Sequence, residues 1–198
     1  MAKAVLLSIR PKWCEKICSG EKTIEVRKTR PRLETPFKCY IYCTKDAKMQ
    51  WWTGSRYSYA DDHSHNAFDK CGNGKVIGEF TCDRIYELET RSPGGSYYVK
   101  GGDQPTTNDV ARQSCLTLRD MHEYLQSKVG YGWHISDLKI YDKPRELREF
   151  MKSNRDCFYA DLGLAKRDCP DCKNSGCFLE RPPQSWCYVQ DKGGGDKC

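Results

Sequence analysis

The spacing of apolar and polar positions in the first part of the chain predicts a strand, a helix and two further strands. Residues 4–9 are almost all apolar, which indicates a strand that is buried on both faces or central in its sheet. Apolar residues then recur at helical spacing from Pro11 to Ser19, and Gly20 follows as a left-handed helix cap. Strands are predicted over residues 23–28 and 37–44, where the apolar positions alternate.

The second part of the chain predicts fewer and more widely spaced elements. Residues 74–83 form a strand that continues toward Leu88, and Thr117 caps a helix that runs to about Gln126. A glycine-rich break precedes a strand over residues 133–141, and a short helical segment follows over residues 145–151. Since one early helix is followed mainly by strands, the order favours an α+β small barrel over a doubly wound parallel sheet.

Two segments without clear periodicity interrupt the predicted domain. We expect a domain over residues 1–150 with insertions at 45–74 and 90–112. Residues 151–198 form a cysteine-rich tail, and its last strand (184–189) is expected to return to the domain. This organisation suits a single domain with decorations, as the length of 198 residues suggests.

Charge and cysteine content narrow the class of partner and the compartment. The formal net charge is +6, and basic residues are concentrated in residues 10–48, which favours anionic partners such as nucleic acid or phosphorylated small molecules. The N-terminal apolar run is too short for a signal peptide, and no apolar stretch is long enough for a membrane span. We therefore expect a cytoplasmic protein without a membrane partner, whose thirteen cysteines are thiols or metal ligands.

The candidate site is a short run of charged residues after the early helix. Lys22 lies in the turn, and Glu25 and Arg27 project from one face of the following strand. Two interpretations are open. The three side chains pair with one another on the surface, or they line a pocket in which the cations meet an anion or base edge and Glu25 accepts from an amino group.

Three residues at the start of the early helix extend the second interpretation. Arg10 and Lys12 are expected at the rim of the pocket, in contact with phosphate, and Trp13 beside them can stack on a base. Trp133, in the later strand, is predicted to be core or pocket wall.

The run Gly20-x-Lys22-x-x-Glu25-x-Arg27 resembles the G-x-K-x-x-E-x-R signature of the ASCH domain family, with every fixed position present. Residues 7–13 resemble the strand-then-helix entry of that family, and residues 132–136 resemble a later strand of bacterial and phage ASCH-like proteins. The resemblance implies a PUA-like β-barrel with the early helix packed at its mouth. It also implies a cleft beside that helix, which accepts RNA, a modified base or a nucleotide-like ligand.

The resemblance implies a second activity as an alternative. Small ASCH proteins similar to this chain hydrolyse the amide of N4-acetylcytidine, and their catalytic lysine maps to Lys22. The residue three positions later is threonine in those enzymes and Glu25 here, and the partner glutamate position is occupied by Ser114. Binding of RNA or a nucleoside or nucleotide is therefore our first prediction, and an amidohydrolase is the alternative.

The tail carries a third hypothesis, a zinc-stapled interaction protein. A C-P-D-C run followed by two more cysteines is the kind of spacing that holds tetrahedral zinc, although the second C-x-x-C of a zinc ribbon is missing. The alternative is a loop of reduced thiols. No cofactor is required by the first prediction, and the sequence does not predict the oligomeric state. The candidate zinc ligands are Cys169, Cys172, Cys177 and Cys187.

Overall fold

A computed structural model describes residues 2–49, 71–101, 105–153 and 177–191. Within these ranges the chain forms three α-helices and two sheets, which confirms the α+β class predicted from the order of elements. The chain divides into two compact units, which we call unit 1 and unit 2. Unit 1 comprises Met1–Cys14, Lys38–Glu79 and Lys139–Cys198, and unit 2 comprises Glu15–Phe37 and Phe80–Leu138.

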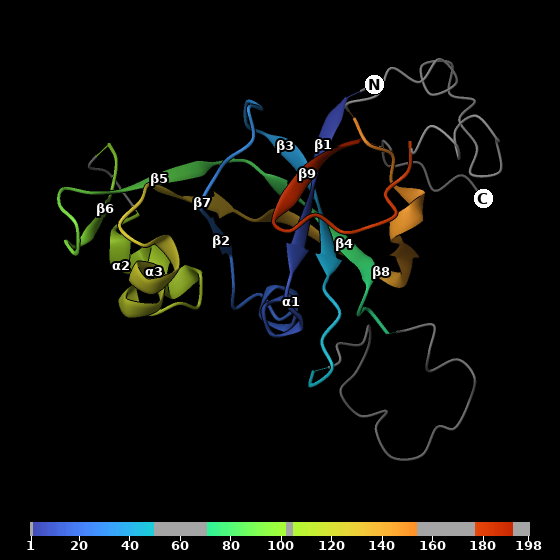
Figure 1. Ribbon diagram of the computed structural model, residues 1–198, viewed down its shortest axis with the longest axis horizontal. Coiled ribbons are helices and arrows are strands. Elements are labelled where there is room, and N and C mark those ends of the chain that lie inside the picture. Colours follow the sequence, from blue (N-terminus) through green and yellow to red (C-terminus); the bar gives the residue numbers. More distant parts are fainter. Residues whose placement is uncertain (1, 50–70, 102–104, 154–176, 192–198) are drawn as a thin grey trace. The chain divides into compact units, whose positions relative to one another are not determined.

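The main sheet of unit 1 has five strands in the order β8-β4-β3-β1-β9 (Figure 1). The central strand β1 runs parallel to β3 on one side and antiparallel to β9 on the other. This position explains its largely apolar sequence, because a strand with neighbours on both edges and packing on both faces buries most of its side chains. The bounds are β1 Lys3–Ile9, β3 Phe37–Cys43, β4 Lys75–Cys82, β8 Ser136–Glu146 and β9 Trp186–Gln190.

The core of unit 1 gathers apolar side chains from these strands. Leu6 of β1, Tyr40 of β3 and Val76 of β4 pack with Phe150, and all four side chains are almost fully buried. The rings of Tyr40 and Phe150 meet edge to face, with centroids 4.9 Å apart. Phe150 follows a short 3-10 helix, η2 (Leu147–Glu149), where the sequence predicts one or two helical turns.

Unit 2 contains a four-stranded sheet in the order β2-β7-β5-β6, together with helices α2 and α3. Apolar residues of both helices, among them Val110, Met121 and Leu125, form one core with Ile24 and Val26 of β2. The bounds are β2 Ile24–Arg27, β5 Ile85–Thr90, β6 Tyr97–Val99, α2 Thr107–Gln113, α3 Leu118–Leu125 and β7 Gly130–His134.

Both short helices of unit 2 begin with a capping box. Thr106 caps α2 and Thr117 caps α3. In each case the carboxylate of an aspartate three residues later accepts a hydrogen bond from the backbone N–H of the cap residue. Such caps satisfy the free N–H groups of the first turn, so they matter most in helices of only two turns. The helix predicted from Thr117 is confirmed. Helix α2 was missed.

Helix α1 (Pro11–Cys18) occupies the place predicted for the early helix. Pro11 begins it, where a missing N–H is harmless, and Gly20 follows with φ +77°, as expected for a left-handed cap. Among the helices within the described ranges, none has the length and apolar character that a membrane span would need.

The structure corrects three predictions of local structure. The segment 90–112, predicted as a loop insertion, contains β6 and α2. The glycines predicted to separate the helix from the following strand lie inside β7. A Cβ at Gly130 would lie only 2.6 Å from the side chain of Leu125, so glycine leaves room for that side chain. Strand β8 continues through Pro144 to Glu146, because β8 is an edge strand of its sheet and can lack one N–H donor.

Two further predictions concern the late strand and the extent of the strand that begins near residue 74. The predicted return of a late strand is confirmed, because β9 pairs with β1. The strand over residues 74–83 does not simply continue to Leu88, since β4 ends at Cys82 and β5 starts a new strand at Ile85. Strand pairing in the described ranges gives two sheets rather than a closed barrel, so the PUA-like barrel with α1 at its mouth stays a prediction.

Candidate functional site

The turn between α1 and β2 is held by backbone hydrogen bonds from both sides. The amide of Lys22 donates to the carbonyl of Lys16 in α1 at 2.9 Å, and the amide of Thr23 donates to the carbonyl of Gln113 at the end of α2, also at 2.9 Å. The turn is therefore fixed by two helices that are distant in sequence. This fixes the direction in which the Lys22 side chain leaves the backbone.

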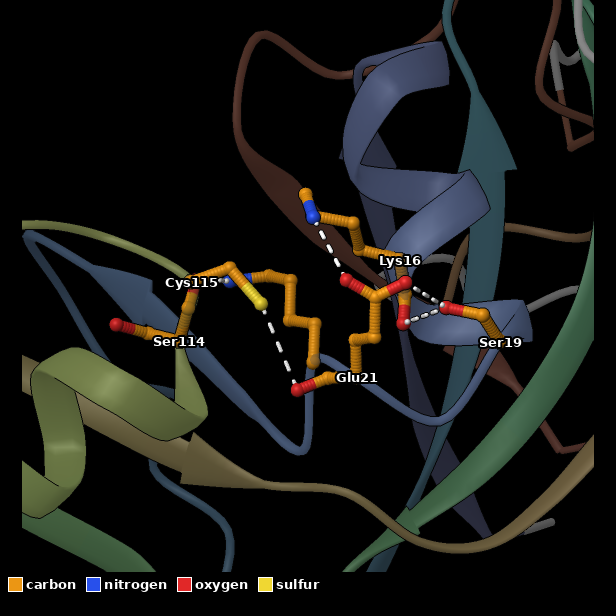
Figure 2. A network of polar contacts seen from close by, with 6 residues as sticks. Lys16, Ser19, Glu21, Ser114 and Cys115 are labelled. Atoms are coloured by element: carbon orange, nitrogen blue, oxygen red, sulfur yellow. Dashed lines mark hydrogen bonds and ion pairs between the residues drawn. The ribbon is translucent and has the colours of Figure 1, made fainter.

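Figure 2 shows the polar contacts around the residue that precedes Lys22. The carboxylate of Glu21 accepts from the ammonium of Lys16 at 2.8 Å and from the hydroxyl of Ser19 at 3.0 Å. The thiol of Cys115 donates to the Glu21 carbonyl at 3.5 Å (Figure 2). These solvent-facing contacts join the turn both to α1 and to the connection between α2 and α3.

Lys22 itself is buried, with 3% of the residue exposed. Its Nζ donates to the carbonyls of Ile24 and Ser114, each at 2.9 Å, and lies 3.1 Å from Oε2 of Glu25. Three acceptors therefore surround the three N–H groups of one ammonium. In this arrangement Lys22 acts as a donor, and use of its nitrogen as a base or nucleophile would require these hydrogen bonds to be broken.

Glu25 lies between two cations. Its Oε2 faces Lys22, and its Oε1 lies 2.9 Å from Nε of Arg27. Burial alone would raise the pKa of Glu25, but the charges of Lys22 and Arg27 and their hydrogen bonds outweigh it, so the pKa is lowered below its ordinary value. Glu25 and Arg27 are 7% and 6% exposed. We call Lys22, Glu25 and Arg27 the charged triad.

The triad lies in unit 2 and takes its orientation from β2. Ile24 and Val26 belong to the apolar core beneath α2 and α3, so Glu25 and Arg27 point to the other face of the sheet. The alternation predicted for this strand is confirmed. The three side chains do pair with one another, as the first interpretation predicts, but not on the surface, since all are more than nine-tenths buried.

Trp133 packs beside the triad. In the antiparallel pairing of β2 with β7 it stands directly opposite Glu25, and directly opposite residues share a face of the sheet. Its side chain is fully buried and meets the ring of Phe37 edge to face at 5.9 Å. This bears out Trp133 as a core residue. A role as the wall of a pocket stays a prediction.

Arg10, Lys12 and Trp13 lie at the N-terminal end of α1, within unit 1. Lys12 Nζ is 4.3 Å from the centre of the half-buried Trp13 ring, and Arg10 and Lys12 are exposed. A cation over a partly exposed indole is a suitable surface for an unpaired base and its phosphate. The role of these three residues in ligand binding stays a prediction.

Three residues near the triad were missed or read differently from sequence. The Ser114 carbonyl is a partner of Lys22, although the Ser114 hydroxyl donates elsewhere, to the carbonyl of Ala111 at 3.0 Å. Tyr124 of α3 is 40% exposed, and Lys28 lies over its ring at 5.1 Å from the centre. An aromatic residue among the charged positions of an amphipathic helix was the available signal for Tyr124.

Only two of the four predicted zinc ligands lie within the described ranges. Cys169 and Cys172 lie outside the described residues. Cys177 is buried, and Cys187 lies in β9 opposite Leu6, where burial raises the pKa of its thiol to about 11. The described ranges contain no group of three residues able to hold a metal ion. The zinc site therefore stays a prediction.

No protein-family model matches the chain, and no curated protein matches its sequence. Solved structures do match. The ASCH protein of Zymomonas mobilis is 15% identical, with 95% of this chain and 88% of that chain covered and a TM-score of 0.49. Two point mutants of the same protein align at 15% and 14% identity, cover 96% and 95% of this chain and 92% and 89% of theirs, and give TM-scores of 0.48 and 0.49.

These structural neighbours are ASCH proteins, the family whose motif the run from Gly20 to Arg27 resembles.

Proposed function

We propose that this chain is an ASCH-like module that binds RNA or a nucleotide-type ligand, with the charged triad as its recognition element. The proposal includes the PUA-like barrel that the motif implies. Arg10 and Lys12 contact phosphate in this view, and Trp13 stacks on a base.

The observation that carries the proposal is the burial of three charges in one place. Removing charged groups from water costs several kcal/mol per ion, and well-packed apolar residues of similar size often give equal or greater stability. A buried triad is therefore weak evidence for a role in stability. Clusters of titratable groups with perturbed environments are, in contrast, frequent at functional sites.

The chemistry of the triad suits a nucleotide base. A carboxylate held ionised, as Glu25 is, can accept from an exocyclic amino group such as those of cytosine and adenine. The guanidinium of Arg27 next to it suits phosphate or a base carbonyl, and the ammonium of Lys22 holds Glu25 in place. The formal net charge of +6 adds a long-range attraction for a polyanion.

A titration of the full chain with fluorescent single-stranded RNA and modified nucleosides at several salt concentrations tests the proposal. We expect binding that weakens as salt rises, because phosphate contacts release counterions. Arg27→Met should reduce affinity about 10- to 100-fold, as loss of a charge-assisted hydrogen bond does. Lys22→Met should also reduce affinity, because Lys22 positions the carboxylate of Glu25.

The matched control is Lys100→Met. Lys100 also pairs with two carboxylates, Glu87 at 3.2 Å and Glu89 at 2.9 Å, but it is exposed and outside the triad. The Lys100→Met variant should bind RNA and nucleosides like the wild type. The absence of any salt-sensitive binding, or equal losses in Lys100→Met and Lys22→Met, would refute the proposal. Thermal melts must show that each variant is folded.

One observation keeps the amidohydrolase as a second candidate. The position that the resemblance assigns to the partner glutamate, Ser114, lies against Lys22, with its carbonyl 2.9 Å from Nζ. The side chain there is not a carboxylate, so we expect no turnover of N4-acetylcytidine by the wild type. Release of cytidine by the wild type, abolished in Lys22→Ala, would reverse the order of the two candidates.

The zinc-stapled interaction protein is tested separately by metal analysis. Stoichiometric zinc in purified protein, lost on substitution of Cys169 and Cys172, would support it. Purified protein without zinc would end it.

A further inference from the structure

We propose that Tyr124 is a stacking residue for an unpaired nucleobase and that Lys28 contacts the phosphate next to that base. The proposal rests on the proposed function and extends it, because it places a part of the ligand outside the buried triad. Neither residue was among those predicted from the sequence.

The first support is the combination of an anchored helix and an exposed ring. Met121 and Leu125 of α3 are fully buried, and the Thr117 capping box fixes the start of the helix. Tyr124, between these two anchors, leaves 40% of its surface in solvent. A partly exposed aromatic side chain on an anchored helix is a suitable platform for a base at little cost in side-chain entropy.

The second support is the position of Lys28. It follows Arg27 of the triad directly in sequence, it is exposed, and its Nζ lies 5.1 Å from the centre of the Tyr124 ring. An ammonium beside an aromatic ring can contact the phosphate of a nucleotide whose base is stacked on that ring. The pair therefore offers both halves of a nucleotide a partner.

The third support is electrostatic. Partial burial raises the pKa of the Tyr124 hydroxyl, Arg27 lowers it, and Glu25 raises it. Two members of the triad therefore act on this tyrosine, which links α3 to the candidate site through space.

A second cation–aromatic pair in the same unit, an exposed arginine with a half-buried tyrosine, is not proposed as a base-stacking site. Arg91 lies 5.4 Å from the centre of the Tyr98 ring, so the geometry is similar. The Tyr98 hydroxyl, however, donates to Glu89 at 2.8 Å, and Glu87 is a neighbour through Lys100. Two carboxylates disfavour a phosphate there. A cation–aromatic pair alone is therefore not sufficient, and Tyr98 provides a matched control.

Stacking on a side chain requires a base that is not already paired. The ligand class is therefore a single-stranded RNA segment or a free nucleotide rather than a duplex. A nucleoside offers the base without the phosphate, and a nucleoside 5′-monophosphate offers both. The four probes are single-stranded RNA, duplex RNA, a nucleoside and a nucleoside 5′-monophosphate. Together they separate the contribution of the ring from that of the lysine.

The experiment measures affinities of the full chain for the four probes in the wild type, Tyr124→Ala, Tyr124→Phe, Lys28→Ala and Tyr98→Ala. Tyr124→Ala should weaken binding of single-stranded RNA about 5- to 150-fold, the range for loss of one stacked base. Tyr124→Phe keeps the ring and should bind like the wild type, as should Tyr98→Ala. Lys28→Ala should lower the slope of log affinity against log salt by about 0.7, the value for one phosphate of a single strand.

The outcomes distinguish the two proposals. If the wild type binds single-stranded RNA and Tyr124→Ala binds equally well, the stacking assignment is wrong and the proposed function stands. Preference for duplex RNA would also overturn the stacking assignment. If the wild type binds none of the probes, both proposals fail. Equal losses in Tyr124→Ala and Tyr98→Ala would indicate general damage to unit 2 and overturn the assignment.

Discussion

Substitution of Glu25 by glutamine removes one charge and almost no volume, which makes it the sharpest perturbation of the charged triad. Glutamine keeps one oxygen acceptor, but its amide nitrogen replaces an oxygen that now accepts from Lys22 or Arg27. Whichever way the amide is turned, two buried cations lose their shared counter-charge. We expect a large loss of stability from this single change.

The magnitude follows from the burial of all three partners. Removing one member of a buried ion pair costs about 3–5 kcal/mol, because the remaining charge stays buried and uncompensated. Lys22 retains two carbonyl acceptors at 2.9 Å, which favours the lower end of that range. A chain of this size loses about 2–4 °C of melting temperature per kcal/mol, so the variant should melt about 6–20 °C below the wild type.

The pH dependence provides the more specific test. The pKa of Glu25 is lowered from its ordinary value of 4.5 by the two cations, against the effect of burial. The folded state therefore binds this proton less readily than the unfolded state, and the stabilisation is fully present above 4.5 and lost as the pH falls through the folded pKa. The difference between wild type and Glu25→Gln should be constant above about pH 5.5 and should narrow below pH 4.5.

Urea denaturation at a series of pH values measures this difference, since urea, unlike guanidinium chloride, does not add salt that screens charges. Glu87→Gln is the control. Glu87 pairs with Lys100 at the surface, and its substitution should change stability far less. A Glu25→Gln variant as stable as the wild type near neutral pH, or a gap that widens on acidification, would refute the description of the triad as buried and ionised.

Three further outcomes follow from separate features of the structure. Gly78→Ala should destabilise by about 1–3 kcal/mol in urea denaturation, because a Cβ would stand 2.5 Å from the backbone oxygen of Lys139; an unchanged midpoint would contradict that close approach. Thr117→Ala should cost about 1 kcal/mol through loss of the α3 cap, and Thr117→Ser should restore most of it. Cys82, whose pKa is raised to about 12 mainly by burial, should resist alkylation of the native protein at pH 8, whereas the half-buried Cys115 should react faster than Cys82; mass spectrometry that finds equal rates for the two would refute this ordering.

The local features of the site could be predicted from sequence because their determinants are neighbours in the chain. The left-handed Gly20, the short strand β2 and the common face of Glu25 and Arg27 all follow from helix capping and period-two alternation. Burial of these residues could not be predicted in this way. It depends on packing around β2, which the alternation pattern does not contain.

The features that were missed depend on contacts between distant segments. The carbonyl of Ser114 reaches Lys22 only because the end of α2 bonds to the turn before β2. Gly130 reads as a chain breaker until the side chain of Leu125 is placed against it. Pro144 reads as a strand end, because nothing in the sequence indicates that β8 is an edge strand.

The pairing of β1 on both edges has a consequence for the order of events during synthesis. One neighbour, β3, follows β1 after α1 and β2, but the other, β9, is translated after every other strand in the described ranges. The most apolar strand therefore emerges from the ribosome long before its sheet can be completed. Such long-range pairing predicts slow folding. It also predicts that the unpaired, apolar edge of β1 stays exposed for longer, a situation in which chaperones commonly act.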